Sequence, residues 1–204
     1  MNGGILQLWV ERLALDPAAW TAGHALQLLM GQDAPARVGR ADLWEIEDLG
    51  PSPADATGDA DRHARFETWM RSSNLFMNPS RDRGKLLAGS PPEMGAAIGH
   101  VVCVDRGAGE SRAHALTLGH ALGGRWKVRR GTVWTLAWPG ERAESVPALL
   151  ETAAFARRRH TGLLVQPESQ EARLFVDAWD CPALPAGDSI GAQAPAGGSD
   201  GGVA

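Results

Sequence analysis

Two histidines occupy matching places in a repeated four-residue string, and they are the first candidates for chemistry. Gly23-His24-Ala25-Leu26 recurs as Gly119-His120-Ala121-Leu122. On a helix each imidazole lies about 200° around from the apolar stripe that follows it. Three interpretations stay open: packing at the surface or between repeats, contact with a partner, or two imidazoles joined in a metal or acid–base site. No carboxylate is fixed beside either histidine by spacing, so we predict no catalytic residue and no metal ligand.

Four basic residues form a second candidate set. The stretch from Arg37 to Trp44 aligns with Lys127 to Trp134 at an offset of 90, which also pairs Arg40 with Arg130. Cationic side chains of this kind bind phosphate groups. Together with the two histidines they are predicted contacts for a phosphorylated metabolite or a partner, and the structural alternative is solvated charge at strand ends. The paired tryptophans are expected to pack against a helix or the other repeat.

Recognisable catalytic motifs are missing from the sequence. It holds no HExxH, no GxxxxGK[ST] loop and no CxxC pair. The string Gly187–Gly191 matches GxSxG, but it stands in a low-complexity tail instead of between a strand and a helix. We therefore expect a chain that is not catalytic by itself and needs no cofactor. An enzyme that uses His24 and His120 remains the alternative.

The chain is predicted to be a tandem duplication. Beside the two blocks above, Asn74–Pro79 matches Gly162–Pro167, and Leu86-Leu87 then falls on Leu174-Phe175 at an offset of 88. Three blocks in one order, at offsets of 96, 90 and 88, are hard to obtain by chance. The repeats cover 5–88 and 99–179, with a linker at 89–98.

Hydrophobic periodicity predicts the same order of elements in both repeats, β-α-β-α-β. Asp16-Pro17 supplies an N-cap and a first-turn proline for the first helix, which Gly31 ends. The predicted strands cover 6–10, 37–47, 75–77, 101–104, 126–137 and 162–166, and two of the later helices cover 60–72 and 144–159. Between them, the first helix of the second repeat is predicted to carry His114, Leu118, Ala121 and Leu122 at the stripe positions of Ala18, Ala22, Ala25 and Leu26. The fold class is α+β: an antiparallel or mixed sheet with helices on one face, and a pseudo-twofold axis between the repeats.

Composition narrows the class of protein. With 204 residues, 44% of them hydrophobic, the chain can build a globular core, and a net charge of −4 argues against a dedicated binder of nucleic acid or acidic membranes. No leader and no membrane-spanning run is recognised, so a cytoplasmic protein is expected. Cys103, in an apolar run, is expected to be buried. Residues 183–204, rich in Gly, Ala and Pro, are predicted to be disordered.

The first repeat resembles the PurS family, the small subunit of the bacterial phosphoribosylformylglycinamidine synthase, an amidotransferase of purine biosynthesis. The residues that carry the likeness are Leu15-Asp16-Pro17, His24-Ala25-Leu26, Arg37-Val38-Gly39-Arg40 and Leu43-Trp44-Glu45-Ile46-Glu47. They are similar to the family's order of an LDP turn, a helix with HAL, an R-x-G-K turn and a short strand. The family's subunit is about as long as one repeat, so the duplication resembles a covalent dimer of it.

The resemblance implies a function that is structural. The family's subunit is not catalytic and bridges the synthetase and glutaminase subunits of the amidotransferase, in symmetric oligomers. We therefore expect a PurS-like assembly or scaffold protein that forms a homo-oligomer. The alternative is a domain that binds or senses a phosphorylated metabolite, with the ligand at the interface between the repeats. The fold alone does not distinguish between these two functions.

Overall fold

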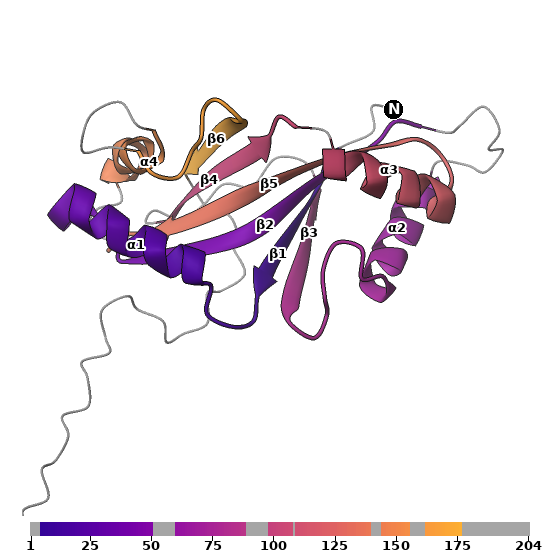
Figure 1. Ribbon diagram of the computed structural model, residues 1–204, viewed down its shortest axis with the longest axis horizontal. Coiled ribbons are helices and arrows are strands. Elements are labelled where there is room, and N and C mark those ends of the chain that lie inside the picture. The colour runs from indigo at the N-terminus through magenta and orange to yellow at the C-terminus, as the bar shows by residue number, and fades with distance from the viewer. Residues whose placement is uncertain are drawn as a thin grey trace, which may run out of the picture.

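A computed structural model describes residues 5–50, 60–88, 98–107, 109–139, 144–155 and 162–176 (Figure 1). The strands are β1 (Ile5–Arg12), β2 (Arg37–Asp48), β3 (Asp82–Ala88), β4 (Ile98–Asp105), β5 (Trp126–Ala137) and β6 (Gln170–Val176). The helices are α1 (Pro17–Met30), α2 (Ala60–Ser72), α3 (Gly109–Leu122) and α4 (Val146–Ala154), and a 3-10 turn (Gly31–Asp33) follows α1. The predicted α+β class is confirmed.

All six strands form one antiparallel sheet in the order β3-β1-β2-β5-β4-β6. The long central strands β2 and β5 pair from Arg37 opposite Ala137 to Asp48 opposite Trp126. The order is symmetric about this pair. In one half, Leu8 of β1 lies between its cross-strand partners Trp44 and Leu86; in the other, Val101 of β4 lies between Trp134 and Leu174.

The start and end of α1 follow from three residues. Asp16 caps the helix by accepting a hydrogen bond from the Ala18 backbone N–H at 2.8 Å, and Pro17 fills the first helical position, where no N–H is needed. Gly31 ends the helix with φ at 58°, a left-handed value that favours glycine. These boundaries agree with the prediction.

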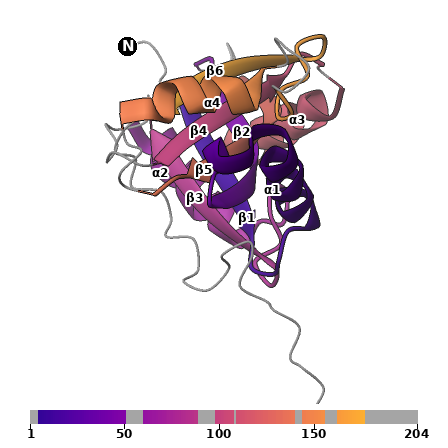
Figure 2. The same cartoon turned by 90° about the vertical axis from the view of Figure 1, so that its left-hand side faces the viewer.

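The first face of the sheet carries two apolar clusters. Ala22 and Leu26 of α1 and Leu150 of α4 pack on Val101 and Leu136. The second cluster unites α2 and α3 with the sheet through Phe66, Met70, Leu118, Leu8, Trp44, Ile46 and Val128. Cross-strand pairs such as Leu8 with Trp44 and Ile46 with Val128 place the strand residues of the two clusters on this same face. Figure 2 views the end that carries α1 and α4.

The opposite side, the second face, has a smaller buried cluster. Trp9, Leu43, Val102 and Val133 belong to it. The Trp9 ring also lies edge-on to the ring of His100, with 5.3 Å between centroids, although β1 and β4 are separated by two strands. The sheet is therefore curved enough for these two side chains to meet.

Gly131 marks a close approach between β5 and β4. A Cβ atom at this position would lie 2.0 Å from the backbone oxygen of Cys103. Backbone atoms cannot turn aside as a flexible side chain can, so only glycine fits here.

The third strand of each half lies later than predicted. Residues 75–77 and 162–166 are not strands; Phe76, Leu164 and Val165 instead bury their side chains in the two clusters of the first face. Turns follow at 78–82 and 166–170, and β3 and β6 begin there. The short apolar runs thus signal core side chains in a loop, because proline follows each run within two residues and a turn forms.

Two further predictions about helices need correction. Helix α4 ends at Ala154, because Phe155 has an extended backbone, and not at 159. Helices α1 and α3 begin 92 residues apart, and their buried positions agree at that offset, as with Leu26 and Leu118. The repeated string aligned these helices at an offset of 96, which is four residues, or about one helical turn, too far. The strings still matched because residues four apart lie on the same face of a helix.

Several predictions concern parts of the chain outside the described residues. They are residues 89–97 of the linker predicted at 89–98, the tail at 183–204 and the string at 187–191; residue 98 of that linker is instead the first residue of β4. The predicted start of the second repeat at 99 falls one residue inside β4.

Candidate functional site

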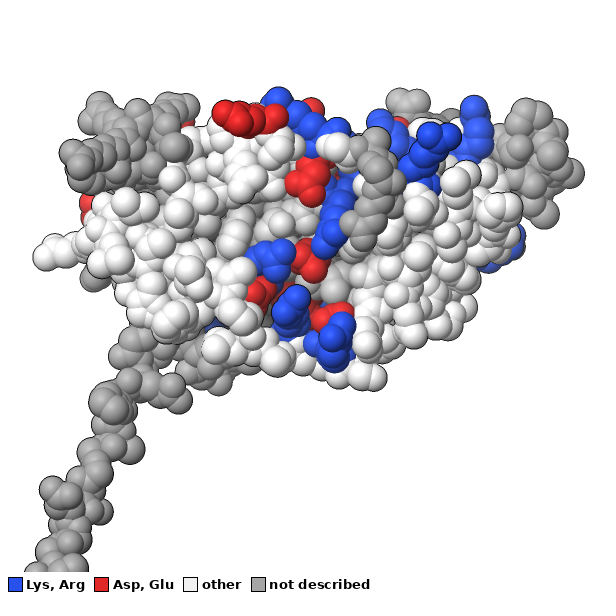
Figure 3. Space-filling model, in the orientation of Figure 1, with Lys and Arg blue, Asp and Glu red and all other residues white. Residues whose placement is uncertain are grey.

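A band of polar and aromatic residues crosses the first face where the two halves meet. We call it the seam: Arg40, Asp42 and Trp44 of β2 with Arg130, Thr132 and Trp134 of β5. Asp42 lies opposite Thr132 at its centre, flanked by the pairs Arg40–Trp134 and Trp44–Arg130. The seam separates the two apolar clusters of this face. In Figure 3 charged side chains of both signs gather in a band between two lobes with few charges.

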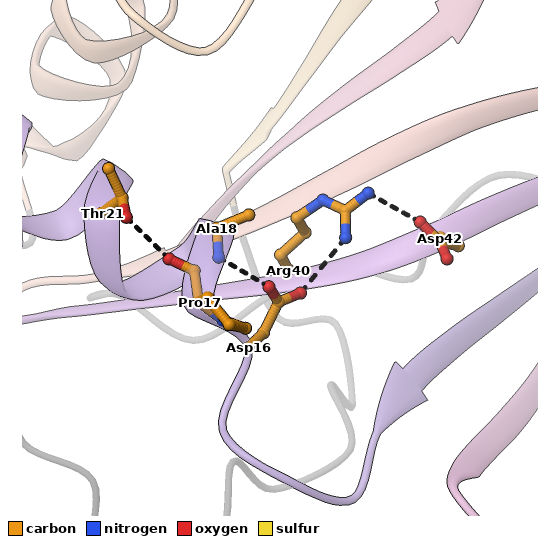
Figure 4. A network of polar contacts seen from close by, with 6 residues as sticks. All are labelled: Asp16, Pro17, Ala18, Thr21, Arg40 and Asp42. Atoms are coloured by element: carbon orange, nitrogen blue, oxygen red, sulfur yellow. Dashed lines mark hydrogen bonds and ion pairs between the residues drawn. The ribbon is translucent and has the colours of Figure 1, made fainter.

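Arg40 is held by groups from three elements. Its guanidinium forms ion pairs with Asp42 at 2.8 Å and with Asp16 at 3.2 Å, and it lies over the Trp134 ring at 6.0 Å from the centroid. Asp16 serves twice, because its other carboxylate oxygen caps α1 through the Ala18 N–H (Figure 4). The cap, the ion pairs and the ring contact therefore form one unit that ties α1 to both central strands.

Arg130 makes the corresponding contact in the other direction. Its guanidinium lies over the ring of Trp44, 5.5 Å from the centroid. The same ring meets His114 of α3 at 4.5 Å and Phe76 at 5.3 Å. Each half of the sheet thus contributes an arginine that lies over a tryptophan of the other half.

The charge around Arg40 determines what the seam can bind. Two carboxylates already contact this guanidinium, so a phosphate group would have to displace at least one of them and would meet the other as a like charge. The contacts at Arg40 therefore favour a joining role over an open anion site.

The four predicted basic residues are divided between the two faces. Arg40 and Arg130 lie on the first face, whereas strand alternation places Arg37 and Lys127 on the second. Lys127 forms an ion pair with Glu47 at 3.4 Å there. The structure therefore does not assemble these four residues into one site.

The second face carries a polar network around Glu45, a residue that the sequence analysis did not single out. Glu45 is only 2% exposed. Its carboxylate accepts a hydrogen bond from the Gln7 amide at 3.1 Å, pairs with Arg129 at 2.6 Å and also bonds Arg173. The network connects β1, β2, β5 and β6. Burying a carboxylate is costly unless it is paired in this way.

His100 and Cys103 are the other polar groups buried in β4. His100 Nδ1 lies 3.0 Å from the hydroxyl oxygen of Thr135, and burial lowers the pKa of His100 to about 3. Cys103 is buried as predicted; its thiol donates to the Leu164 carbonyl at 3.6 Å, and burial together with the nearby Asp105 raises its pKa to about 12. At neutral pH both are uncharged and suit a structural role.

The two predicted histidines are not brought together. His24 is exposed on α1, where its ring meets Trp20 at 4.2 Å, and His120 is exposed in the last turn of α3. These helices pack in different clusters and lie at opposite ends of the sheet (Figure 1). With the helices in register His24 corresponds to Leu116, so the two imidazoles are not equivalent. Within the described residues no group of three His, Cys, Asp or Glu side chains is arranged to hold a metal.

The described chain thus forms an α+β protein whose polar groups join its two halves. None of its described helices is both long and apolar enough to span a membrane. A scan against protein-family models and searches of curated proteins and of solved structures find no match to this chain.

Proposed function

We propose that the chain is a non-catalytic assembly protein similar to the PurS family, built from two tandem repeats with their helices on one face of a shared sheet. The observation that carries the proposal is the unit formed by Asp16 and Arg40. These residues belong to two of the strings behind the resemblance, Leu15-Asp16-Pro17 and Arg37-Val38-Gly39-Arg40. Their direct contact supports reading the strings as parts of one structural motif.

The symmetry of the sheet supports the tandem arrangement. Corresponding strands have offsets of 93 for Leu8 and Val101, 90 for Trp44 and Trp134, and 88 for Leu86 and Leu174. The turns before β3 and β6 also agree. The Asn78 N–H donates to the Asp82 side chain at 2.8 Å, and 88 residues later the Gln166 N–H donates to the Gln170 side chain at 3.1 Å. A duplicated and fused ancestral unit accounts for all of these correspondences.

The partners that this function implies are the synthetase and glutaminase subunits of the amidotransferase, in the cytoplasm. The test is a pull-down of the tagged full-length chain from extract of its own cells, followed by mass spectrometry. Both subunits should be recovered in comparable amounts. The matched control bait carries Gly131→Ala, which should disrupt the sheet, so proteins captured by both baits are discounted. Recovery of neither subunit with the intact bait would reject the role in purine biosynthesis.

A further inference from the structure

The outer surface of α1 carries no Asp, Glu, Lys or Arg, and its largest exposed side chains, Trp20 and Leu28, are apolar, with Thr21 and His24 exposed beside them. From Pro17 to Gln32 the chain contains no Asp, Glu, Lys or Arg. Large apolar side chains are nevertheless exposed on α1, on the loop before it and on the neighbouring turn, to between 42% and 89% of their area: Leu13, Leu15, Trp20, Leu28 and Leu163. Monomeric proteins seldom leave such groups clustered in water, and a patch of this kind marks an interaction surface.

An open apolar groove of about 430 Å³ runs along the same helix. It lies between α1 and the turn at Leu163 and is lined by Pro17, Ala18, Thr21, Ala22, Ala25 and Leu163. Trp20, half exposed, projects from the adjoining side of the helix. Helix α1 therefore presents both a large exposed side chain and, elsewhere on its surface, a groove that can receive one. We call this surface, with the five exposed side chains above, the α1 face.

The corresponding helix of the other half is different. Helix α3 exposes Leu116, but the charged residue Arg112 is exposed on the same helix, whereas α1 has no Asp, Glu, Lys or Arg. The apolar surface is thus a property of one half of the molecule and not a general feature of its helices. This difference also provides a matched control position.

The absence of charge indicates which partner fits. In a twofold-symmetric contact each group near the axis meets its own copy, so any charge there is repelled by an identical one. From Pro17 to Gln32 the chain has no Asp, Glu, Lys or Arg that would be repelled in this way, and none that would select a partner of opposite sign. A second copy of the same chain is therefore compatible with this helix.

The available area is also what a dimer requires. From their exposed fractions, the five side chains offer on the order of 600 Å² of apolar surface per chain. A standard interface buries about 800 Å² per partner, of which roughly two thirds is apolar in homodimers. The α1 face alone therefore supplies the apolar centre of a stable contact.

We propose that the chain forms a homodimer through the α1 face, with Trp20 and Leu28 at the contact. This proposal does not depend on the assembly role argued above, since a partner of the amidotransferase type is not needed for it.

The test is the molar mass of the full-length chain in solution, measured by light scattering or sedimentation over a range of concentrations. The unmodified protein should be a dimer at micromolar concentration. Trp20→Glu and Leu28→Glu should each weaken the dimer at least about 100-fold, because each buries a carboxylate against an apolar surface. Leu116→Glu, at a leucine of α3 that is 59% exposed, should leave it unchanged within about threefold.

Three results would overturn the proposal. They are a monomer at all accessible concentrations, a dimer that withstands both α1 substitutions, or a dimer that Leu116→Glu disrupts equally. Leu28 is 89% exposed, so Leu28→Glu should fold normally, and its melting temperature verifies that a loss of dimer is not a loss of fold. The pull-down can fail while the molar mass shows a dimer, and the pull-down can succeed while the molar mass shows a monomer. The two proposals are therefore judged separately.

Discussion

Asp16 connects the cap of α1 with the ion pair at the seam, and substitutions there separate the two contributions. Asp16→Ala removes the acceptor for the Ala18 N–H and the partially buried contact with Arg40. A lost N-cap costs about 1 kcal/mol, and a half-buried ion pair adds up to about 1 kcal/mol more. The free energy of unfolding should therefore fall by about 2 kcal/mol. Asp16→Asn keeps a capping oxygen and loses only the charge, so it should cost about half as much.

The assay is urea unfolding followed by tryptophan fluorescence, with Arg40→Met and the double variant completing a double-mutant cycle. For a chain of this size, Asp16→Ala should lower the melting temperature by about 5 °C. The cycle should give a coupling energy of about 1 kcal/mol between Asp16 and Arg40. A cost below about 0.5 kcal/mol for Asp16→Ala would refute the stabilising role of Asp16. An Asp16→Asn variant as destabilised as Asp16→Ala would show that the cap contributes nothing.

Three other predictions concern the buried part of the sheet. Gly131→Ala should destabilise the fold by at least about 3 kcal/mol or prevent folding. Gly99→Ala should cost much less, because its Cβ would meet only the movable side chain of Leu150. Equal melting temperatures of the two variants would contradict this expectation. In a Cys181→Ser background, the Cys103 thiol should react with a disulfide reagent only as fast as the protein unfolds, because the thiol is buried and its pKa is raised to about 12. Rapid labelling of the native protein would contradict both the burial and the raised pKa. The pKa of His100 is lowered from 6.5 to about 3, so the unfolded chain binds the proton first as pH falls below 6.5, and stability should drop through that window with a slope approaching about 1.4 kcal/mol per pH unit. His100→Gln should flatten this acid dependence, and an unchanged slope would assign it to other groups.

Local signals in the sequence predict those parts of the fold that depend on neighbouring residues. Asp16-Pro17 and Gly31 define the ends of α1 because capping involves groups one to three residues apart. Alternating apolar residues predict β1, β2 and β5 because each pairs over at least seven residues. The short runs at 75–77 and 162–166 carry too few residues to distinguish a strand from a loop that buries its side chains.

The residues of the candidate site show which contacts can be predicted from the sequence alone and which cannot. Strand alternation alone already separates Arg37 from Arg40 and Lys127 from Arg130, since each pair is three residues apart and so points to opposite faces. The spacing of these residues in the sequence therefore already argues against one anion site shared by all four. The Glu45 network, by contrast, requires knowledge that β5 and β6 bring Arg129 and Arg173 toward β2, and only the register of the sheet supplies it.

The polar contacts explain why the two halves behave as one body. On the first face each half places an arginine over a tryptophan of the other, and on the second face Glu45 of one half bonds two arginines of the other. If either half stood alone, Glu45 would be a carboxylate without these counterions, and Trp44 and Trp134 would lose their cationic partners. Of the residues predicted as ligand or partner contacts, Arg40 and Arg130 therefore help to hold the sheet together, whereas His24 and His120 take no part in these contacts. Among the described residues, α1 and the segments beside it leave large apolar side chains exposed, and it is there that a second copy of the chain is proposed to bind.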